Sequence, residues 1–431
     1  MKGINPFWNV MVVLIIGILL VMALPLGVSR VEASPATIYV PDDYPTIQAA
    51  VDAASPGDTI IVRDGTYTEN VDVNKSVILE GEGMPVVDAA GNGSAITVTA
   101  GGCTIEGFKV IGGTGGGWGL ENAGIKVQSD NNVIRENAAS NNNVGIYLHY
   151  DSSNNTLVAN RASNNRYGIS LRASSSNTLR NNIMELNQYN FGIKAEQESQ
   201  FRQNIDTSNT VDGKPILYLV DQHDKVIDCS TNAGYVGVIN STNIVVTNLT
   251  LTNNQEGVLL AYTRNSRVSN IHALNNSRGI ALLHASNNNL VGNEASSPGT
   301  NGIGIFLHKS DDNTLEGNNL HSSALYGIYL QYSHGNNITN NDVLNSQYGI
   351  GIISSSDNWL KNNKIRDNWD FGIYLVNESY SGNLFNNRIV ENTITNNYKY
   401  GVYLQDNFRH PPFSRPSPPF KNSLSQQFRK K

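Results

Sequence analysis

The chain has 431 residues, with 30 Lys and Arg against 36 Asp and Glu, which gives a formal charge of −6 at pH 7. Nucleic-acid binding requires a basic patch, and this mild, spread-out acidic excess provides none, so we expect no nucleic acid among the partners. Cys103 and Cys229 lie about six coils apart in the repeat described below, which is too far for a disulfide between them. We expect both side chains to be buried.

The first element is expected to be a signal peptide over residues 1–33. Lys2 precedes an apolar run from Val10 to Leu24, and Val31-Glu32-Ala33 fits a small-x-small cleavage site. An uncleaved membrane anchor is the alternative, but the run is at the short end for a membrane span. In both cases we expect a secreted or cell-surface protein, periplasmic in a Gram-negative cell, with no membrane span once the signal is removed.

Residues 34–58 are expected to form an N-terminal cap. Within them Thr46–Ala54 has the pattern of a short amphipathic helix that ends before Pro56, with Ile47, Ala50, Val51 and Ala54 on one face. Such a helix would cover the open edge of the first coil that follows it, and an uncovered edge invites aggregation.

From residue 124 to 404 the chain repeats a block of Gly, an aliphatic residue, any residue and usually Leu, as in Gly145-Ile146-Tyr147-Leu148. Successive blocks are 22 to 25 residues apart over most of this stretch. That period is too short for two helices, and apolar residues two positions apart predict strands. We therefore predict an all-β solenoid over residues 59–404, a parallel β-helix in which each coil packs only on its neighbours.

Asparagines recur at equivalent positions after the second strand of each coil. Stacked Asn side chains can hydrogen-bond along the axis and satisfy polar groups at tight corners, so we expect a ladder. A disordered Asn-rich tract is the alternative, but disorder would not keep the aliphatic residues in phase. The asparagines expected in the ladder are Asn160, Asn181, Asn293, Asn318, Asn340, Asn362 and Asn386.

Two stretches depart from the repeat. Residues 210–236 are expected to be an irregular insertion, and residues 405–431, which are basic and Pro-rich, a disordered tail. Hydrolysis of a glycoside requires two carboxylates, and loops on a rigid scaffold often carry function. The catalytic candidates are therefore the three carboxylates of the insertion, although charge is also ordinary in a solvated loop: Asp221, Asp224 and Asp228.

Strand alternation separates core positions from ligand positions. The residues one and three after each repeat glycine (Gly+1 and Gly+3) are aliphatic and should face the core, so Gly+2 and Gly+4 should face outward. Outward aromatic rings beside polar groups suit an extended sugar chain, although such rings also stack on each other in sheets. The expected binding residues are Tyr147, His149, Arg172, Phe306, His308, Tyr329, Gln331, Tyr374 and Tyr403. The aromatic residues just before the glycine (Gly−1) should by the same alternation pack in the core: Tyr167, Phe191, Tyr326, Tyr348, Phe371 and Tyr400.

Two stretches resemble known families. Asp58 to Val71, with Pro45-Thr46-Ile47-Gln48-Ala49-Ala50 before it, is similar to the opening of pectin-lyase-like β-helices, which implies a right-handed, single-stranded coil. Val211 to Gln222, followed by Gly234-Tyr235-Val236-Gly237-Val238, resembles the NosD-like family of secreted β-helix proteins with carbohydrate-binding and sugar-hydrolase-type repeats. The namesake of that family is a periplasmic factor for copper-site maturation.

The function expected from these features is the binding of an extended polysaccharide or cell-surface glycan along the outward stripe. We favour a binding protein over an enzyme; a polysaccharide lyase, hydrolase or epimerase, a structural surface-layer component and a copper-site maturation factor are the alternatives. Copper proteins favour clusters of His, Cys and Met. His149 and His308 share the Gly+4 position about seven coils apart, and His284 falls one residue outside it, so we expect no metal site. Neither calcium nor copper is supported as a cofactor, and the oligomeric state stays open.

Overall fold

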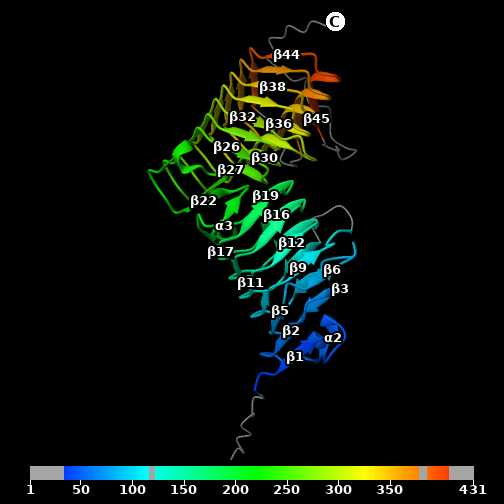
Figure 1. Cartoon of the computed structure of the whole chain (residues 1–431). Helices are drawn as coiled ribbons and strands as arrows, with labels where there is room; N and C mark the ends of the chain where they lie inside the picture. The colour runs from blue at the N-terminus through cyan, green and yellow to red at the C-terminus, as the bar shows by residue number, and fades with distance from the viewer. Residues whose placement is uncertain (1–33, 116–121, 378–385, 407–431) are drawn as a thin grey trace, which may run out of the picture.

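The predicted fold is confirmed by a computed structural model, which describes residues 34–115, 122–377 and 386–406. The chain is an all-β, right-handed parallel solenoid of about 15 turns with very little helix. Figure 1 shows it as two stacked segments, with the N-terminal helix at one end. The expected signal peptide and most of the expected tail lie outside the described residues. In the described part of the chain, no helix is both long and apolar enough for a membrane span.

The predicted cap is present as helix α2 (Ile47–Ala53). The Thr46 side chain accepts a hydrogen bond from the Ala49 N–H, and the Glu69 carboxylate accepts from the N–H groups of Ile47 and Gln48 at 3.0 Å each. These contacts satisfy the donors that the first turn of a helix leaves without partners. The apolar face of α2 is fully buried, so the helix covers the first coil.

The first segment has three sheets, each built from one strand per coil. Sheet A contains β1 (Thr37–Val40), β2 (Thr59–Val62), β5 (Ile78–Gly81), β8 (Thr104–Glu106), β11 (Val133–Arg135), β14 (Thr156–Val158), β17 (Thr178–Arg180) and β20 (Asn204–Ile205). Sheet B contains β3 (Thr66–Thr68), β6 (Val86–Asp88), β9 (Lys109–Ile111), β12 (Ala138–Ser140), β15 (Arg161–Ser163), β18 (Ile183–Glu185) and β21 (Thr210–Val211). Sheet C, which carries the repeat glycines, contains β4 (Val71–Val73), β7 (Ile96–Val98), β10 (Ala123–Val127), β13 (Val144–Leu148), β16 (Tyr167–Arg172) and β19 (Tyr189–Lys194).

The second segment repeats this plan. Sheet D carries its glycines and contains β22 (Lys214–Val220), β24 (Tyr235–Ile239), β27 (Glu256–Ala261), β30 (Arg278–Leu283), β33 (Ile303–His308), β36 (Tyr326–Gln331), β39 (Tyr348–Ile353), β42 (Phe371–Asn377) and β45 (Tyr400–Asp406). Sheet E contains β23 (Val226–Ile227), β25 (Val245–Thr247), β28 (Arg267–Ser269), β31 (Asn289–Val291), β34 (Thr314–Glu316), β37 (Asn337–Thr339), β40 (Trp359–Lys361) and β43 (Arg388–Val390). Sheet F contains β26 (Thr250–Thr252), β29 (His272–Leu274), β32 (Glu294–Ser296), β35 (Asn319–His321), β38 (Asp342–Leu344), β41 (Lys364–Arg366) and β44 (Thr393–Thr395).

The two segments are connected by a hairpin, which we call the joint. After β19 the chain forms helix α3 (Glu198–Phe201), β20 and β21, and β22 then pairs antiparallel with β21, the one antiparallel pair among the described strands. Asp212 and Gly213 make the turn with φ of 46° and 76°, as a two-residue hairpin turn requires. The glycine-bearing sheet D therefore continues sheet B as one 16-stranded sheet, while sheet C ends at β19 (Figure 1).

The stretch expected to be an irregular insertion, residues 210–236, forms this joint. It contains the hairpin, β23 and the short 3-10 helix η1 (Cys229–Thr231). Cys229 is exposed there, so the prediction that both cysteines are buried holds for Cys103 alone.

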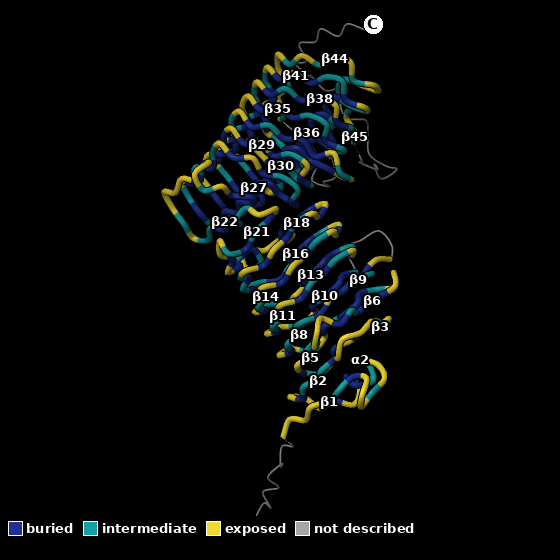
Figure 2. The backbone as a smooth tube through the Cα atoms, in the orientation of Figure 1, coloured by how far each residue is buried: buried dark blue, intermediate teal, exposed yellow. Residues whose placement is uncertain are grey.

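The positions that follow the repeat glycine alternate between the core and the outer face as predicted. Ile328 and Leu330, at Gly+1 and Gly+3, are fully buried in the core of the second segment. Figure 2 shows buried strands inside and exposed turns at the rim throughout the described residues.

The prediction that the aromatic residues at Gly−1 pack in the core is wrong for most of them. A Cβ on Gly327 would lie 2.3 Å from the core side chain of Val343, so the glycine itself faces inward beside the inward Ile328. Two inward positions in succession shift the alternation, as in a β-bulge, and the residue before the glycine turns outward. Two of them are buried. Phe191 pairs with Ile169 of β16, occupies a Gly+1 position and is fully buried. Tyr326 is 6% exposed and packs in the cluster that continues from the core of the first segment.

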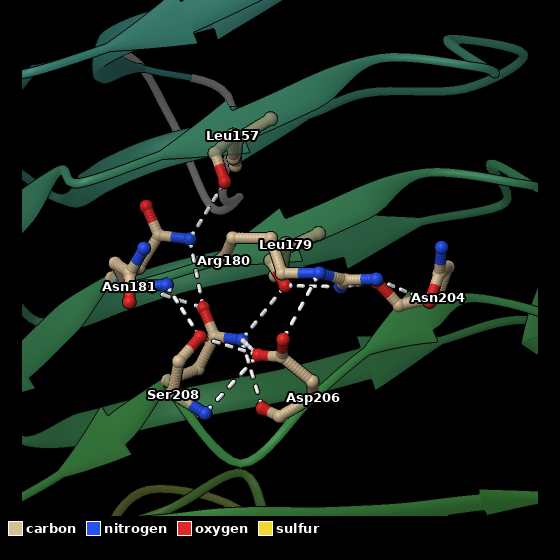
Figure 3. Close-up of polar contacts among 9 residues, drawn as sticks. Leu157, Leu179, Arg180, Asn181, Asn204, Asp206 and Ser208 are labelled. Carbon is tan, nitrogen blue, oxygen red and sulfur yellow. Dashed lines mark hydrogen bonds and ion pairs between the residues drawn. The ribbon is translucent and has the colours of Figure 1, made fainter.

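Asparagine ladders run along both segments, but partly through different residues than predicted. Asn160, Asn293 and Asn318 belong to the ladders. Asn181, Asn340, Asn362 and Asn386 do not: each is the first residue of an Asn-Asn pair, and the second residue of the pair joins the ladder instead. The first residue of the pair takes the turn, with φ of 55° to 58° at Asn181, Asn340 and Asn362. Figure 3 shows the last turn of the first segment, where the Asn181 N–H donates to Ser208 Oγ at 2.8 Å and Arg180 contacts Asp206 at 3.0 Å.

Replacing Asn341 with alanine is expected to lower the free energy of unfolding by about 1–3 kcal/mol, because it leaves buried donors without partners. Asn341 Oδ1 accepts from the N–H and Nδ2 of Asn318, both at 2.9 Å, and its Nδ2 donates to Asn363 Oδ1 at 2.9 Å. Urea unfolding of both variants measures the effect, with Asn340→Gly as the matched control, since Asn340 is exposed at φ 58°. Equal stability of the two variants would contradict the ladder's role.

Candidate functional site

The outer faces of sheets C and D meet where β19 reaches the second segment. The Gln255 N–H donates to the Phe191 carbonyl at 2.9 Å, and its Nε2 donates to Ser170 Oγ, on the outer face of sheet C, at 2.8 Å. Leu259 and Ala281, at outward positions of sheet D, are fully buried and pack with the apolar core of the first segment. The joint therefore creates an inner corner between two sheet faces that a straight solenoid would leave apart.

Four charged side chains, which we call the corner cluster, come together here: Arg172, Lys194, Glu256 and Arg278. The Arg278 guanidinium lies 3.3 Å from Glu256 Oε1 and 4.6 Å from the centre of the Phe306 ring. The pKa of Lys194 is lowered by loss of solvent around its ammonium group and then by the positive charges of Arg172 and Arg278. Cations thus outnumber the single carboxylate of the cluster.

Glu256 is the buried member of the corner cluster, with 1 % of its surface exposed. Burial raises its pKa to about 7, although Arg278 and the Ile193 N–H favour the charged form. Its Oε2 has no hydrogen-bond partner in the described part of the chain. The carboxyl group therefore titrates near neutral pH.

Outward aromatic rings continue from the corner along sheet D. We call this row the aromatic ladder: Phe306, Tyr326, Tyr329, Tyr348, Phe371, Tyr374, Tyr400 and Tyr403. Its rings alternate between the Gly−1 and Gly+2 positions, as where Tyr326 stacks on Tyr329 with centres 4.4 Å apart. Neighbouring ring centres are 4.4 to 5.9 Å apart, with planes 8° to 33° from parallel. The rings therefore stack on each other, and a ligand would meet mainly their edges and hydroxyl groups.

The binding residues predicted on sheet C lie close together. Arg172 Nη1 is 3.5 Å from the Tyr147 hydroxyl, and its guanidinium lies over the Tyr150 ring at 4.5 Å. The His149 ring contacts Tyr147 edge-on with centres 5.2 Å apart. Tyr147 faces outward as predicted but is fully buried, so Arg172 and His149 present the accessible atoms of this group.

The binding residues predicted on sheet D form a second group that begins at the corner. Phe306 is mostly buried beneath Arg278, and the Tyr329 ring lies next to it at 5.3 Å. His308 Nδ1 is 3.2 Å from Gln331 Oε1. Farther along, the Tyr374 hydroxyl is 2.8 Å from Gln405 Oε1, and the Tyr403 ring stacks on Phe371 with centres 4.5 Å apart. The corner cluster links this group to the group on sheet C.

His284 and His308 lie together with Glu196, contrary to the expectation of scattered histidines. One ligand atom from each of the three lies within 4.8 Å of the other two, the one such group of three among the described residues. The imidazole ring of His284 stacks on Tyr262 at 4.6 Å, and the Tyr262 hydroxyl donates to the Glu196 carbonyl at 2.8 Å. Desolvation is the main cause that lowers the pKa of both histidines. We call these three residues the His–Glu cluster.

The three carboxylates proposed for catalysis stabilise turns. Asp221 accepts from Arg202 Nη2 at 2.8 Å and from Asn240 at 2.7 Å, Asp224 contacts His223 Nδ1 at 2.8 Å, and Asp228 accepts from the Ser230 N–H at 3.0 Å. These hydrogen bonds lower the pKa of all three carboxyl groups. A general acid needs a raised pKa, so this geometry gives the catalytic hypothesis no support.

Several residues of the corner were missed from the sequence. Glu256 and Arg278 occupy Gly−1, which was assigned to the core. Lys194 stands two residues after Gly192, a Gly+2 position by its sequence, but the pairing of β16 with β19 places it beside Arg172 at Gly+4. The signal that could have revealed the corner is Asp212-Gly213 between apolar residues, a strong indicator of a hairpin.

Solved structures with related folds include several enzymes. A DFA-IIIase from Arthrobacter chlorophenolicus A6, without its lid, is 13% identical with a TM-score of 0.36, over 77% of this chain and 95% of that one. The A-module of a mannuronan C-5 epimerase from Azotobacter vinelandii is 16% identical with a TM-score of 0.30, over 84% and 93%. Pectate lyase Pel9A is 16% identical with a TM-score of 0.31, over 66% and 77%. At such identities the likeness concerns the fold alone.

A curated relative, a cell surface glycoprotein of Methanothermus fervidus, is 42% identical over 76 residues. That match spans 17% of this chain and 13% of the relative's length. The family model described as "Periplasmic copper-binding protein (NosD)" matches residues 51–219 and 207–410, and the two matches overlap at the joint. The chain belongs to this NosD family of β-helix proteins, which lie outside the cytoplasm, in the periplasm or at the cell surface.

Proposed function

We propose that this protein binds an extended acidic polysaccharide, which enters the corner between sheets C and D and follows the aromatic ladder. The observation that carries the proposal is the convergence of Arg172, Lys194 and Arg278 from both segments beside the first ring of the ladder. Arg guanidinium groups bind carboxylates through paired, charge-assisted hydrogen bonds. A polymer of uronic acids offers such a carboxylate on every sugar.

The ladder supplies the second part of the site. Its rings are spaced by the coil repeat and keep edges and hydroxyl groups along one face of sheet D. Hydroxyl groups, together with Gln331, can hydrogen-bond to sugar hydroxyls along the chain. The corner therefore selects ligands that carry negative charge, and the ladder selects ligands with a long sugar chain.

Replacing Arg172 with glutamine is expected to weaken binding of polygalacturonate about tenfold, because a charge-assisted contact is lost. Isothermal titration calorimetry on the full chain at low and high salt measures this, and affinity should fall as salt screens the charges. Arg388→Gln, on the exposed face of sheet E, is the matched control and should bind as the wild type does.

Neutral dextran serves as the second ligand in the same measurement. Binding of dextran as tight as that of polygalacturonate would overturn the acidic class, and an unchanged affinity of Arg172→Gln would overturn the site. Tyr374→Ala should weaken binding of long chains more than of single sugars, because that ring lies farther along the ladder from the corner.

A further inference from the structure

The family description names copper but no ligand, so the donor atoms of this chain must be tested against a metal. Imidazole nitrogens and carboxylate oxygens bind Cu²⁺ and Zn²⁺, whereas Cu⁺ prefers Cys and Met. The His–Glu cluster offers two imidazoles and one carboxylate. Its donor set therefore fits a divalent transition metal.

We propose that Glu196, His284 and His308 bind one Cu²⁺ or Zn²⁺ ion, which ties the two segments together across the joint. Glu196 follows β19 of the first segment, while His284 and His308 lie at the ends of β30 and β33 of the second. The ion would thus be shared between parts of the chain that are about a hundred residues apart in sequence but adjacent at the corner.

Unsatisfied nitrogen atoms point to a missing ligand. Nε2 of His284 and Nε2 of His308 are both buried, and neither has a hydrogen-bond partner within the described residues. Buried polar atoms are nearly always paired, so each exception requires an explanation. Two such atoms on neighbouring histidines, beside one carboxylate, are explained together by a shared ion.

Two of the three ligands already lie near the separation that an ion requires, and all three ligand atoms lie within 4.8 Å of one another. Ligand atoms at about 2.0–2.2 Å from one ion lie about 3–3.5 Å apart. Glu196 Oε2 is already 3.6 Å from His308 Nε2, and it is also 3.6 Å from Lys309 Nζ. The carboxylate would exchange the exposed lysine for the metal, and water would complete the coordination.

Supporting contacts hold two of the three ligands in place. His308 Nδ1 faces Gln331 Oε1 at 3.2 Å, which leaves Nε2 as the metal-binding atom. His284 is held by its stack on Tyr262, whose hydroxyl also fixes the backbone of Glu196. Contacts of this kind orient metal ligands and raise affinity.

Titration of the metal-stripped full chain with Cu²⁺ and with Zn²⁺ tests the proposal. We expect one ion per chain by calorimetry and elemental analysis, and tighter binding of Cu²⁺ than of Zn²⁺. Electron paramagnetic resonance of the Cu²⁺ form should show coupling to two imidazole nitrogens. Hydrogen exchange should slow at residues 194–198 when the ion is bound, because the ion joins that stretch to the second segment.

His284→Ala and His308→Gln should each weaken binding by more than the 10–100-fold that loss of an outer contact costs. Circular dichroism confirms that each variant keeps the fold. The matched control is His272→Ala, in a second group of two histidines and a glutamate where both imidazoles already contact Glu294, at 2.6 and 3.0 Å.

Two results would overturn the proposal. One is a stoichiometry of one ion per chain that survives in the double variant His284→Ala/His308→Gln. The other is loss of the ion in His272→Ala but not in His284→Ala, which would place the metal on sheet F.

Discussion

Replacing Arg278 with methionine is expected to lower the free energy of unfolding by about 1–1.5 kcal/mol at pH 8, because without its cation the buried Glu256 carboxyl must be held protonated in the folded state. The Glu256 side chain is 2% exposed, and Arg278 Nη1 is the cation that faces it at 3.3 Å. Methionine keeps much of the packing volume but removes the charge. Urea unfolding followed by circular dichroism measures the difference.

The loss should shrink at pH 5, where Glu256 takes up a proton and no longer needs the cation. Arg267→Met, at an exposed position of β28, is the control and should change stability little at either pH. A loss for Arg278→Met that is equal at pH 5 and pH 8 would show that packing, not charge, explains the effect.

Replacing Glu256 with glutamine is expected to abolish a loss of stability of about 3 kcal/mol that the wild type undergoes as pH rises from 4.5 to above 7. The pKa of Glu256 in the folded protein is about 7, above the ordinary value of 4.5, so the folded state binds more protons in this range. Its contribution is fully present below pH 4.5 and is lost as pH rises through 7.

The measurement is the difference in unfolding free energy between wild type and Glu256→Gln at pH 5, 6, 7 and 8. Taking the difference is necessary because His284 and His308, with lowered pKa values, act in the opposite direction as pH rises through their range. The difference should grow in favour of the variant with rising pH. A difference that stays constant would mean that Glu256 titrates normally in the folded state.

Much of the fold could be predicted from the sequence because it depends on local repetition. The aliphatic residues at Gly+1 and Gly+3 must face the core, so Ile146 and Ile169 were correctly predicted to occupy equivalent core positions on adjacent coils. The Gly−1 error has a local cause as well. A glycine that faces inward beside an inward isoleucine breaks strict alternation, and the pattern of residue types alone does not reveal which way a glycine faces.

The candidate site was harder to predict because it depends on the joint. His284 and His308 lie on adjacent coils, at neighbouring positions of the repeat, so their proximity could have been inferred from the period. Glu196 reaches them only because the hairpin at Asp212 and Gly213 moves the second segment against β19. Such contacts between distant segments follow from the path of the chain and not from its period.

The hairpin also separates the residue composition of the corner from the number of coils that follow it, two properties that could otherwise change only together. Coils beyond the corner touch only their immediate neighbours, so the gain or loss of a whole repeat there would lengthen or shorten the row of tyrosines without disturbing the corner. Unequal recombination between tandem copies in the gene makes such changes in single steps. Ligand chemistry and ligand length could therefore diverge independently among relatives, the first through substitutions at the corner and the second through repeat number.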